Sequence, residues 1–271
     1  MLRRPAVAGT FYPADRSGLE SMMDKFCACE TPAPGAVGVL SPHAGYMYSG
    51  PVAGAVFACV DVPETAVVLG PNHRGIGAPY GLFSEGSWQT PLGEAAVDEE
   101  LARALAEECP FLESDTASHM HEHSIEVQVP FLQYRREDVR IVPICIGEHD
   151  FGKLVKLGAG IEAAASALGR EVLVVASSDM THYESAEEAE RKDRKAIERM
   201  QALDEEGLWE VVRRERISMC GVAPAVAAIA AARKMGASEG RLVKYTTSGE
   251  ATGDYAQVVG YAGLAFVREP R

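Results

Sequence analysis

Short apolar runs rich in β-branched residues alternate along the chain with helical patterns, and this alternation constrains the fold most strongly. The apolar runs are typical of buried strands and occupy residues 36–40, 65–69, 139–146, 171–176, 242–246 and 258–267. Apolar residues at helical spacing occupy residues 96–109, 151–168, 186–203 and 221–235. The alternation predicts an α/β fold with a central, mostly parallel mixed sheet and helices on both faces. The last run could be an edge or antiparallel strand.

Composition limits the partners and the location of the protein. No repeat or linker divides the 271 residues, so we expect a single domain over residues 1–271. With 39 acidic and 26 basic residues the net charge is −13, which argues against nucleic acid because phosphate binding needs a basic face. The longest apolar stretch, residues 222–232, is too short to cross a bilayer, and no signal peptide is evident. We therefore expect a cytoplasmic protein without a membrane partner.

Chemically active side chains follow four of the predicted strands. His43 and His73 follow the first two strands, and Asp179 and His182 follow the strand at 171–176. His149 follows the strand at 139–146, but it lies between two acidic residues and is expected at the surface. Ligand sites in open α/β sheets form outside the carboxyl ends of the strands. The sequence therefore predicts a shared site at this edge of the sheet.

His43 and His73 have the surroundings of metal ligands. Each lies in a turn that contains proline and glycine, which lets a side chain and its backbone approach an ion closely. Neutral imidazole binds iron, copper, zinc and nickel. One such histidine alone would more simply be hydrogen-bonded to backbone, but the pair favours a metal site.

Asp179 and His182 lie three residues apart after a strand. If they began a helix they would share one face, and the carboxylate could orient the imidazole as a general base. Alternatively both could be ligands, or Ser178 or Asp179 could simply cap the following helix.

Cys220 differs in context from the other five cysteines, which form no Cys-x-x-Cys pair. It precedes the Ala-rich helical pattern, where free N–H groups and the helix dipole favour a thiolate. That thiolate could bind a metal or attack an electrophile, and the alternative is a buried core thiol.

The segment at residues 119–126 holds three histidines at alternate positions. Because apolar residues follow, we expect His123 and Glu126 to turn inward together. His119 and His121 are expected to face solvent.

Motifs in order along the chain resemble those of one family. They are RRPAVAGTFYPAD (3–15), SPHAGYMYSG (41–50), GPNH (70–73), EHSIEVQVPFLQ (122–133), SSDMTHY (177–183), MCG (219–221) and SGEATGDYAQVVGYAG (248–263). Together they resemble the Memo family, also called AmmeMemoRadiSam system protein B, over nearly the whole chain. The family's fold is similar to that of class III extradiol ring-cleaving dioxygenases.

The resemblance implies a metal site with His43, His73 and Cys220 as ligands and with Asp179 and His182 lining the same pocket. It implies a divalent transition metal, Fe(II) first, with copper or zinc as alternatives. The related dioxygenases have a carboxylate as third ligand. A thiolate is softer and can itself be oxidised, so catechol cleavage does not carry over directly.

Further expectations concern the neighbours of this site. Glu126 could complete or buffer it, and His123 and Tyr46 would support the ligands or the substrate. The family's name also implies a functional link to a radical-SAM protein and to an Ammecr-type protein.

Three functions compete on these residues. The first is an iron-dependent, dioxygenase-like oxidoreductase in which His182, held by Asp179, accepts a proton from the substrate. The second is a metal-free hydrolase with Cys220 as nucleophile, His182 as base and Asp179 as the orienting group. The third is a non-catalytic scaffold that binds a peptide or small molecule in the same pocket.

Overall fold

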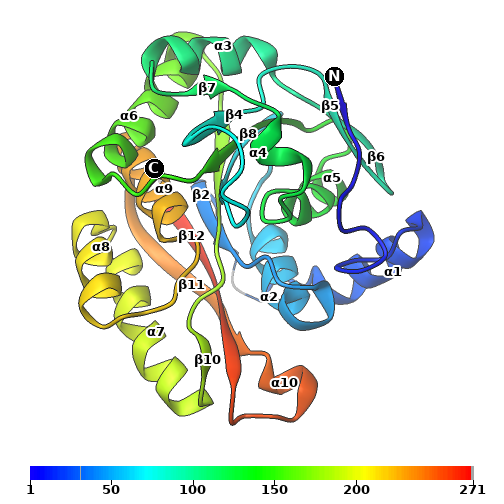
Figure 1. The fold of residues 1–271 in the computed structure, drawn as a ribbon, viewed down its shortest axis with the longest axis vertical. Helices are drawn as coiled ribbons and strands as arrows, with labels where there is room; N and C mark the ends of the chain where they lie inside the picture. Colours follow the sequence, from blue (N-terminus) through cyan, green and yellow to red (C-terminus); the bar gives the residue numbers. More distant parts are fainter. Residues whose placement is uncertain (31, 270–271) are drawn as a thin grey trace.

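Four parallel strands form the middle of the sheet in a computed structural model that describes residues 1–30 and 32–269. Each is a continuous β-branched run buried on both faces, as parallel strands require. In spatial order they are β2 (Ala36–Ser41), β9 (Val172–Ser177), β3 (Thr65–Pro71) and β8 (Arg140–Ile146). Their carboxyl ends meet at one edge of the sheet, as the sequence predicted (Figure 1).

Antiparallel strands extend the sheet on both sides. Beside β2 lies β12 (Val258–Arg268), which pairs with β11 (Ala237–Thr247) and with β10 (His182–Glu184). Beyond β8 lie β4 (Tyr80–Leu82) and β7 (Glu113–Ser114). Within the described residues the sheet has nine strands in the order β10-β12-β2-β9-β3-β8-β4-β7, with β11 on β12. The last predicted strand is thus antiparallel, and the predicted α/β class with a mixed sheet is confirmed.

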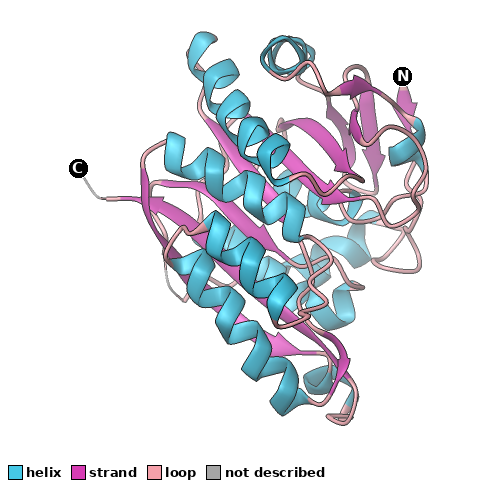
Figure 2. Cartoon of the chain, turned by 60° about the vertical axis from the view of Figure 1, so that its left-hand side comes forward, coloured by secondary structure: helices cyan, strands magenta, loops and turns pink. Residues whose placement is uncertain are grey.

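Helices cover both faces of this sheet, because alternate strand residues point to opposite sides (Figure 2). The strand residues Leu40, Leu69 and Val174 pack against helices in one hydrophobic core. Their neighbours Val39, Val68 and Val175 pack against other helices in a second core on the opposite face. The first face carries α3 (Glu99–Glu108), α6 (Phe151–Ala167), α7 (Ala186–Gln201), α8 (Glu205–Arg214) and α9 (Val222–Lys234). The second carries α1 (Arg16–Phe26), α2 (Tyr46–Cys59) and α5 (Val129–Arg135).

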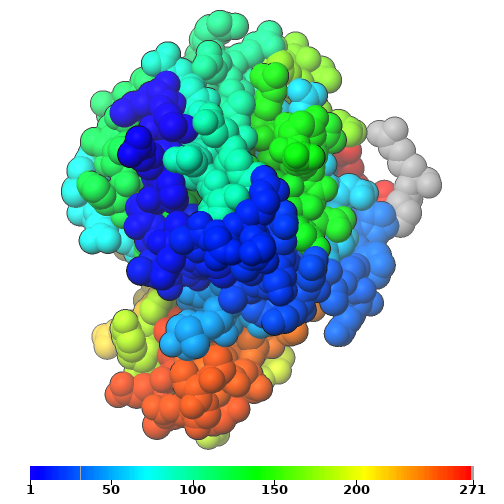
Figure 3. All heavy atoms as spheres, turned by 90° about the vertical axis from the view of Figure 1, so that its right-hand side faces the viewer, coloured from blue at the N-terminus to red at the C-terminus, as the bar shows by residue number. Residues whose placement is uncertain are grey.

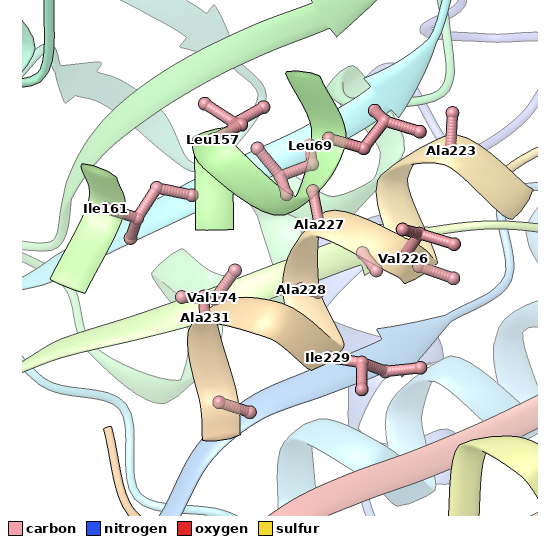
Figure 4. Packing of buried hydrophobic residues seen from close by; sticks show 14 of the residues in the cluster. Leu69, Leu157, Ile161, Val174, Ala223, Val226, Ala227, Ala228, Ile229 and Ala231 are labelled. Atoms are coloured by element: carbon pink, nitrogen blue, oxygen red, sulfur yellow. The ribbon is translucent and has the colours of Figure 1, made fainter. Parts of the chain in front are cut away.

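The Ala-rich pattern forms α9, which is buried throughout residues 222–232 and packs against both the sheet and α6 (Figure 4). Its small side chains let α6 approach closely. A Cβ added at Gly158 of α6 would lie 2.5 Å from the Ala227 carbonyl oxygen, so this contact requires glycine.

The N-terminal segment forms a second, smaller sheet. Its strands are β1 (Leu2–Arg3), β5 (Ser87–Thr90) and β6 (Gly93–Ala96). The segment runs against residues from the first half of the chain (Figure 3). Three short helical turns complete the structure: α4 (Ala117–Met120), η1 (Glu126–Gln128) and α10 (Gly249–Thr252). Among the described helices, none has the length and apolar character that a membrane span needs.

Candidate metal centre

Three histidines from separate parts of the chain meet at the carboxyl edge of the sheet. His43 follows β2, His73 follows β3, and His123 lies in the loop between α4 and η1. One ring nitrogen from each lies within 4.8 Å of the others. The ring centroids are 5.1 Å apart for His43 and His73, 5.4 Å for His43 and His123, and 4.8 Å for His73 and His123. The three side chains could therefore hold one metal ion.

The cluster opens towards solvent on one side. His43 is only 2% exposed, whereas the side chains of His73 and His123 are 31% and 20% exposed. A ligand can thus approach past His73 and His123. The Phe11 ring packs against His123, with 4.8 Å between the ring centroids.

The buried Glu122 carboxylate holds two of the histidines. Oε1 lies 2.8 Å from His73 Nδ1 and 3.4 Å from His123 Nδ1. The carboxylate also accepts the backbone N–H groups of His73, His123 and Ser124. Burial alone would raise its pKa, but the hydrogen bonds and the two imidazoles outweigh burial and lower the pKa to about 2. Glu122 is therefore an anion that orients both rings.

The hydrogen bonds fix the tautomers of His43 and His73. The Ser177 hydroxyl donates to the Ser124 carbonyl oxygen at 2.6 Å, so it must accept from His43 Nδ1 at 2.9 Å. The Glu122 carboxylate can only accept, so His73 Nδ1 also carries its proton. In the neutral form of either ring the lone pair is therefore on Nε2. Neutral imidazole held through Nδ1 is the usual state of a metal-bound histidine.

Burial favours the uncharged form of two members of this cluster, His43 and His123. It lowers the pKa of His43 well below its ordinary value, and the nearby His123 and His73 lower it further. Burial also lowers the pKa of His123. Three imidazole nitrogens beside a fixed anion suit a divalent transition metal, so the donor set fits the cofactor that the resemblance implied.

Asp179 fixes the backbone at His43 rather than the ring of His182. Its Oδ1 accepts the His43 N–H at 2.8 Å, and burial raises its pKa to about 6. The expected helix start at Asp179 is wrong, because residues 179–181 are irregular and His182 begins β10. The capping interpretation is wrong for the same reason: α7 begins at Ala186 and is capped by the Ser185 side chain.

His182 is oriented by the loop before Cys220. Its Nδ1 lies 3.0 Å from the Ser218 carbonyl oxygen, and its N–H donates to the Ser218 hydroxyl at 2.7 Å. Since a carbonyl oxygen can only accept, Nδ1 carries the proton and Nε2 has a lone pair. Asp179 contributes an electrostatic interaction with His182 in place of the expected orienting hydrogen bond.

Cys220 lies directly beside the cluster. Its Sγ is 3.2 Å from His43 Nε2, and it accepts the Asp179 N–H at 3.3 Å. Burial and the Asp179 carboxylate raise the pKa of the thiol, which outweighs the expected effect of the α9 N-terminus. The three-histidine group does not include Cys220, so its role as a ligand stays a prediction.

Glu126 does not reach this group. Its carboxylate pairs with Arg3 at 2.8 Å and accepts the Tyr12 hydroxyl at 2.7 Å. It also accepts two backbone N–H groups of the N-terminal segment, so it anchors that segment instead of completing the metal site.

Tyr46 is buried, and its hydroxyl donates to the Val127 carbonyl oxygen at 2.6 Å.

One position in the histidine-rich segment differs from expectation. His119 was expected to face solvent but is 1% exposed, with Nε2 bonded to the Gly81 carbonyl oxygen. His121 is exposed as expected. Glu122 carried no prediction, although an acidic residue beside His123 was the available signal.

Comparisons with known proteins agree with this fold and with the family resemblance. The family model described as Memo-like protein matches residues 3–265. A MEMO1 family protein of Methanopyrus kandleri is 48% identical over 283 residues, which cover 99% of this chain and 100% of the relative. One from Aquifex aeolicus is 42% identical over 98% of this chain and 99% of the relative. The crystal structure of an uncharacterized Escherichia coli K12 protein shares the fold, with a TM-score of 0.50 and 14% identity over 84% of this chain and 98% of that chain. This chain therefore belongs to the Memo family.

Proposed function

We propose that the protein is a metal-dependent, dioxygenase-like oxidoreductase whose three-histidine cluster takes Fe(II). One observation carries the proposal: Ser177 and Glu122 accept the Nδ1–H groups of His43 and His73, so Nε2 is the ring atom through which each neutral imidazole can bind an ion. His123 completes the group within 4.8 Å. A bound Fe(II) would supply one-electron chemistry and open coordination positions, as in other non-heme iron sites with three protein ligands. Copper and zinc are the alternative metals.

His182 is the proposed general base. Its Nδ1–H is held by the Ser218 carbonyl oxygen, so Nε2 can take a proton from a hydroxyl or thiol of the substrate. The imidazolium so formed would be stabilised by the Ser218 carbonyl dipole and by ionised Asp179. The substrate is proposed to be a small molecule or peptide that enters past the exposed edges of His73 and His123.

The metal-free thiol hydrolase has less support. Burial and Asp179 raise the pKa of the Cys220 thiol, whereas a nucleophilic cysteine needs a lowered one. The ring nitrogen beside the Cys220 sulfur is His43 Nε2, at 3.2 Å, and not a nitrogen of His182. The position of Cys220 beside His43 instead supports the role of metal ligand that the resemblance implies, together with His43 and His73.

The test is anaerobic titration with Fe(II), Zn(II) and Cu(II), followed by oxygen consumption with phenolic and thiol substrates. We expect one ion per chain, lost in His43→Ala, His73→Ala and His123→Ala. His121→Ala is the matched control, because this exposed histidine lies in the same segment. Unchanged metal content in the three cluster variants would refute the metal site. Metal binding without oxygen consumption would favour the non-catalytic scaffold.

Cys220→Ser distinguishes a metal site made of the three histidines from one in which Cys220 is also a ligand. If the thiolate binds the metal, the copper-loaded protein shows a sulfur-to-metal charge-transfer band that this variant lacks. If the three histidines suffice, the variant keeps its spectrum and its metal.

A cytoplasmic location and the link to a radical-SAM protein and an Ammecr-type protein remain part of the proposal, and co-purification of those partners would test the link.

A further inference from the structure

Asp193 is an acidic side chain that points into the core from a strongly charged helix. It lies on α7 and is 0% exposed, while the charged residues around it on the helix pair with one another at the surface. It forms no ion pair within the described residues. A buried carboxylate without a cation costs stability, and an apolar side chain at such a position would often be neutral or stabilising. Core packing therefore does not explain this residue.

Three donors converge on the Asp193 carboxylate. Oδ1 accepts the Thr181 N–H at 3.0 Å and the Thr181 hydroxyl at 2.6 Å, and Oδ2 accepts the Tyr245 hydroxyl at 2.9 Å. Two of these bonds go to one residue, through its backbone and its side chain together. Thr181 lies between Asp179, which holds the His43 backbone, and His182, the proposed base. The carboxylate therefore fixes the connection between two functional groups.

Strand β12 fixes the same connection from the other side. Met180 donates its N–H to the Gly260 carbonyl oxygen at 2.9 Å, and Gly260 donates to the Thr181 carbonyl oxygen at 2.8 Å. A Cβ at Gly260 would lie 2.0 Å from Asp193 Oδ2, so only glycine allows the strand and the carboxylate to approach this closely. The segment is thus held between β12 and α7, with Asp193 as its side-chain acceptor.

We propose that Asp193 is a positioning residue that sets the His182 imidazole and the Asp179 carboxylate relative to the three-histidine cluster. This inference rests on the proposed function only in naming His182 as the base. Asp193 bonds to neither His182 nor Asp179, so it positions them through its two hydrogen bonds to Thr181, in addition to a direct electrostatic interaction with His182. Burial raises the pKa of Asp193, while the donors from Thr181 and Tyr245 oppose that shift.

The test follows the His182 ring by ¹⁵N NMR in metal-free, full-length protein. Wild type is expected to show one tautomer, with the proton on Nδ1. In Asp193→Ala the release of Thr181 should give His182 a mixture of tautomers, while Asp193→Asn, which keeps an acceptor for Thr181, should restore the wild-type signal. In Asp193→Ala the affinity for zinc should fall by much less than ~10-fold, which is the loss expected when a group that holds a metal ligand is removed.

A second pair of variants covers the case in which Asp193→Ala does not fold. Thr181→Val removes the hydroxyl bond to Asp193, whereas Tyr245→Phe removes the bond on the far oxygen and leaves Thr181 held. We expect the first to disturb His182 and the second to leave it unchanged. Equal effects in the two, or an unchanged His182 signal in Asp193→Ala with a lowered unfolding midpoint, would overturn the proposal. Because the His182 signal is recorded without metal or turnover, a failure of the iron hypothesis would not alter this result.

Discussion

Arg3 offers a sharp test of how the N-terminal segment supports the metal centre. Its guanidinium is fully buried, pairs with Glu126 at 2.8 Å and stacks on Trp88 with 4.1 Å from Cζ to the ring centroid. It donates to the carbonyl oxygens of His119 at 2.9 Å and Glu122 at 2.7 Å. The same side chain thus anchors the segment that supplies Glu122 and its neighbour His123.

Replacing Arg3 with Met keeps much of the apolar stem and removes the charge. Glu126 would then be a buried anion without a cation, and two buried carbonyl oxygens would lose their donor. Breaking one side of a buried ion pair costs about 3–5 kcal/mol. Glu126 keeps the Tyr12 hydroxyl and two N–H groups, so we expect a loss near the lower limit, about 3 kcal/mol.

Equilibrium urea unfolding measures this loss, and zinc titration measures the effect on the site. Zinc affinity should fall as well, because the loop that holds Glu122 and His123 loses its anchor. Arg4→Met is the control, since Arg4 is exposed and should change stability by less than about 0.5 kcal/mol. In the double variant with Glu126→Gln, the two losses should overlap by at least ~1 kcal/mol. Additive losses, or an Arg3→Met variant as stable as wild type, would refute the reasoning.

Three further outcomes follow from single contacts. Gly158→Ala forces a methyl group against the Ala227 carbonyl oxygen and should cost about 1–3 kcal/mol in thermal unfolding without changing metal content. Burial lowers the pKa of His119 from 6.5 to about 4, so its stabilising effect is complete above pH 6.5 and is lost as the pH falls towards 4. The loss amounts to about 3 kcal/mol in unfolding free energy, and His119→Gln should remove this part of the pH dependence. Glu122→Gln should weaken metal binding about 10- to 100-fold in a competition titration, and unchanged affinity would show that Glu122 does not orient the ligands.

The sequence predicted those parts of the fold that local patterns determine. The continuous β-branched runs gave the four parallel strands, and the Ala-rich pattern gave α9. Helix α2 was not predicted because Gly50, Pro51 and Gly54 weaken the local helical preference. Its glycines serve a distant contact instead: a Cβ at Gly54 would lie 2.6 Å from the backbone of Phe26 on α1. No local pattern reveals that requirement.

The candidate site, like the fold, was predictable only where it depends on the local sequence pattern. The meeting of His43 and His73 followed from their strands, because parallel strands end at the same edge of the sheet. The helix expected after Asp179 was wrong because His182 pairs with Val259 on β12, a strand that is remote in sequence. The role of Glu122 depends on how its loop turns back towards His73, which spacing alone does not encode.

The position of β12 has a consequence for synthesis of the protein. This strand is formed by residues 258–268, yet it pairs with β2, the first strand of the large sheet to be translated. Until those residues leave the ribosome, one edge of β2 has no partner, and an open strand edge can pair with another chain. Gly260 also reaches the Met180–Thr181 segment only then. We therefore expect nascent chains to need protection from aggregation until β12 has been added.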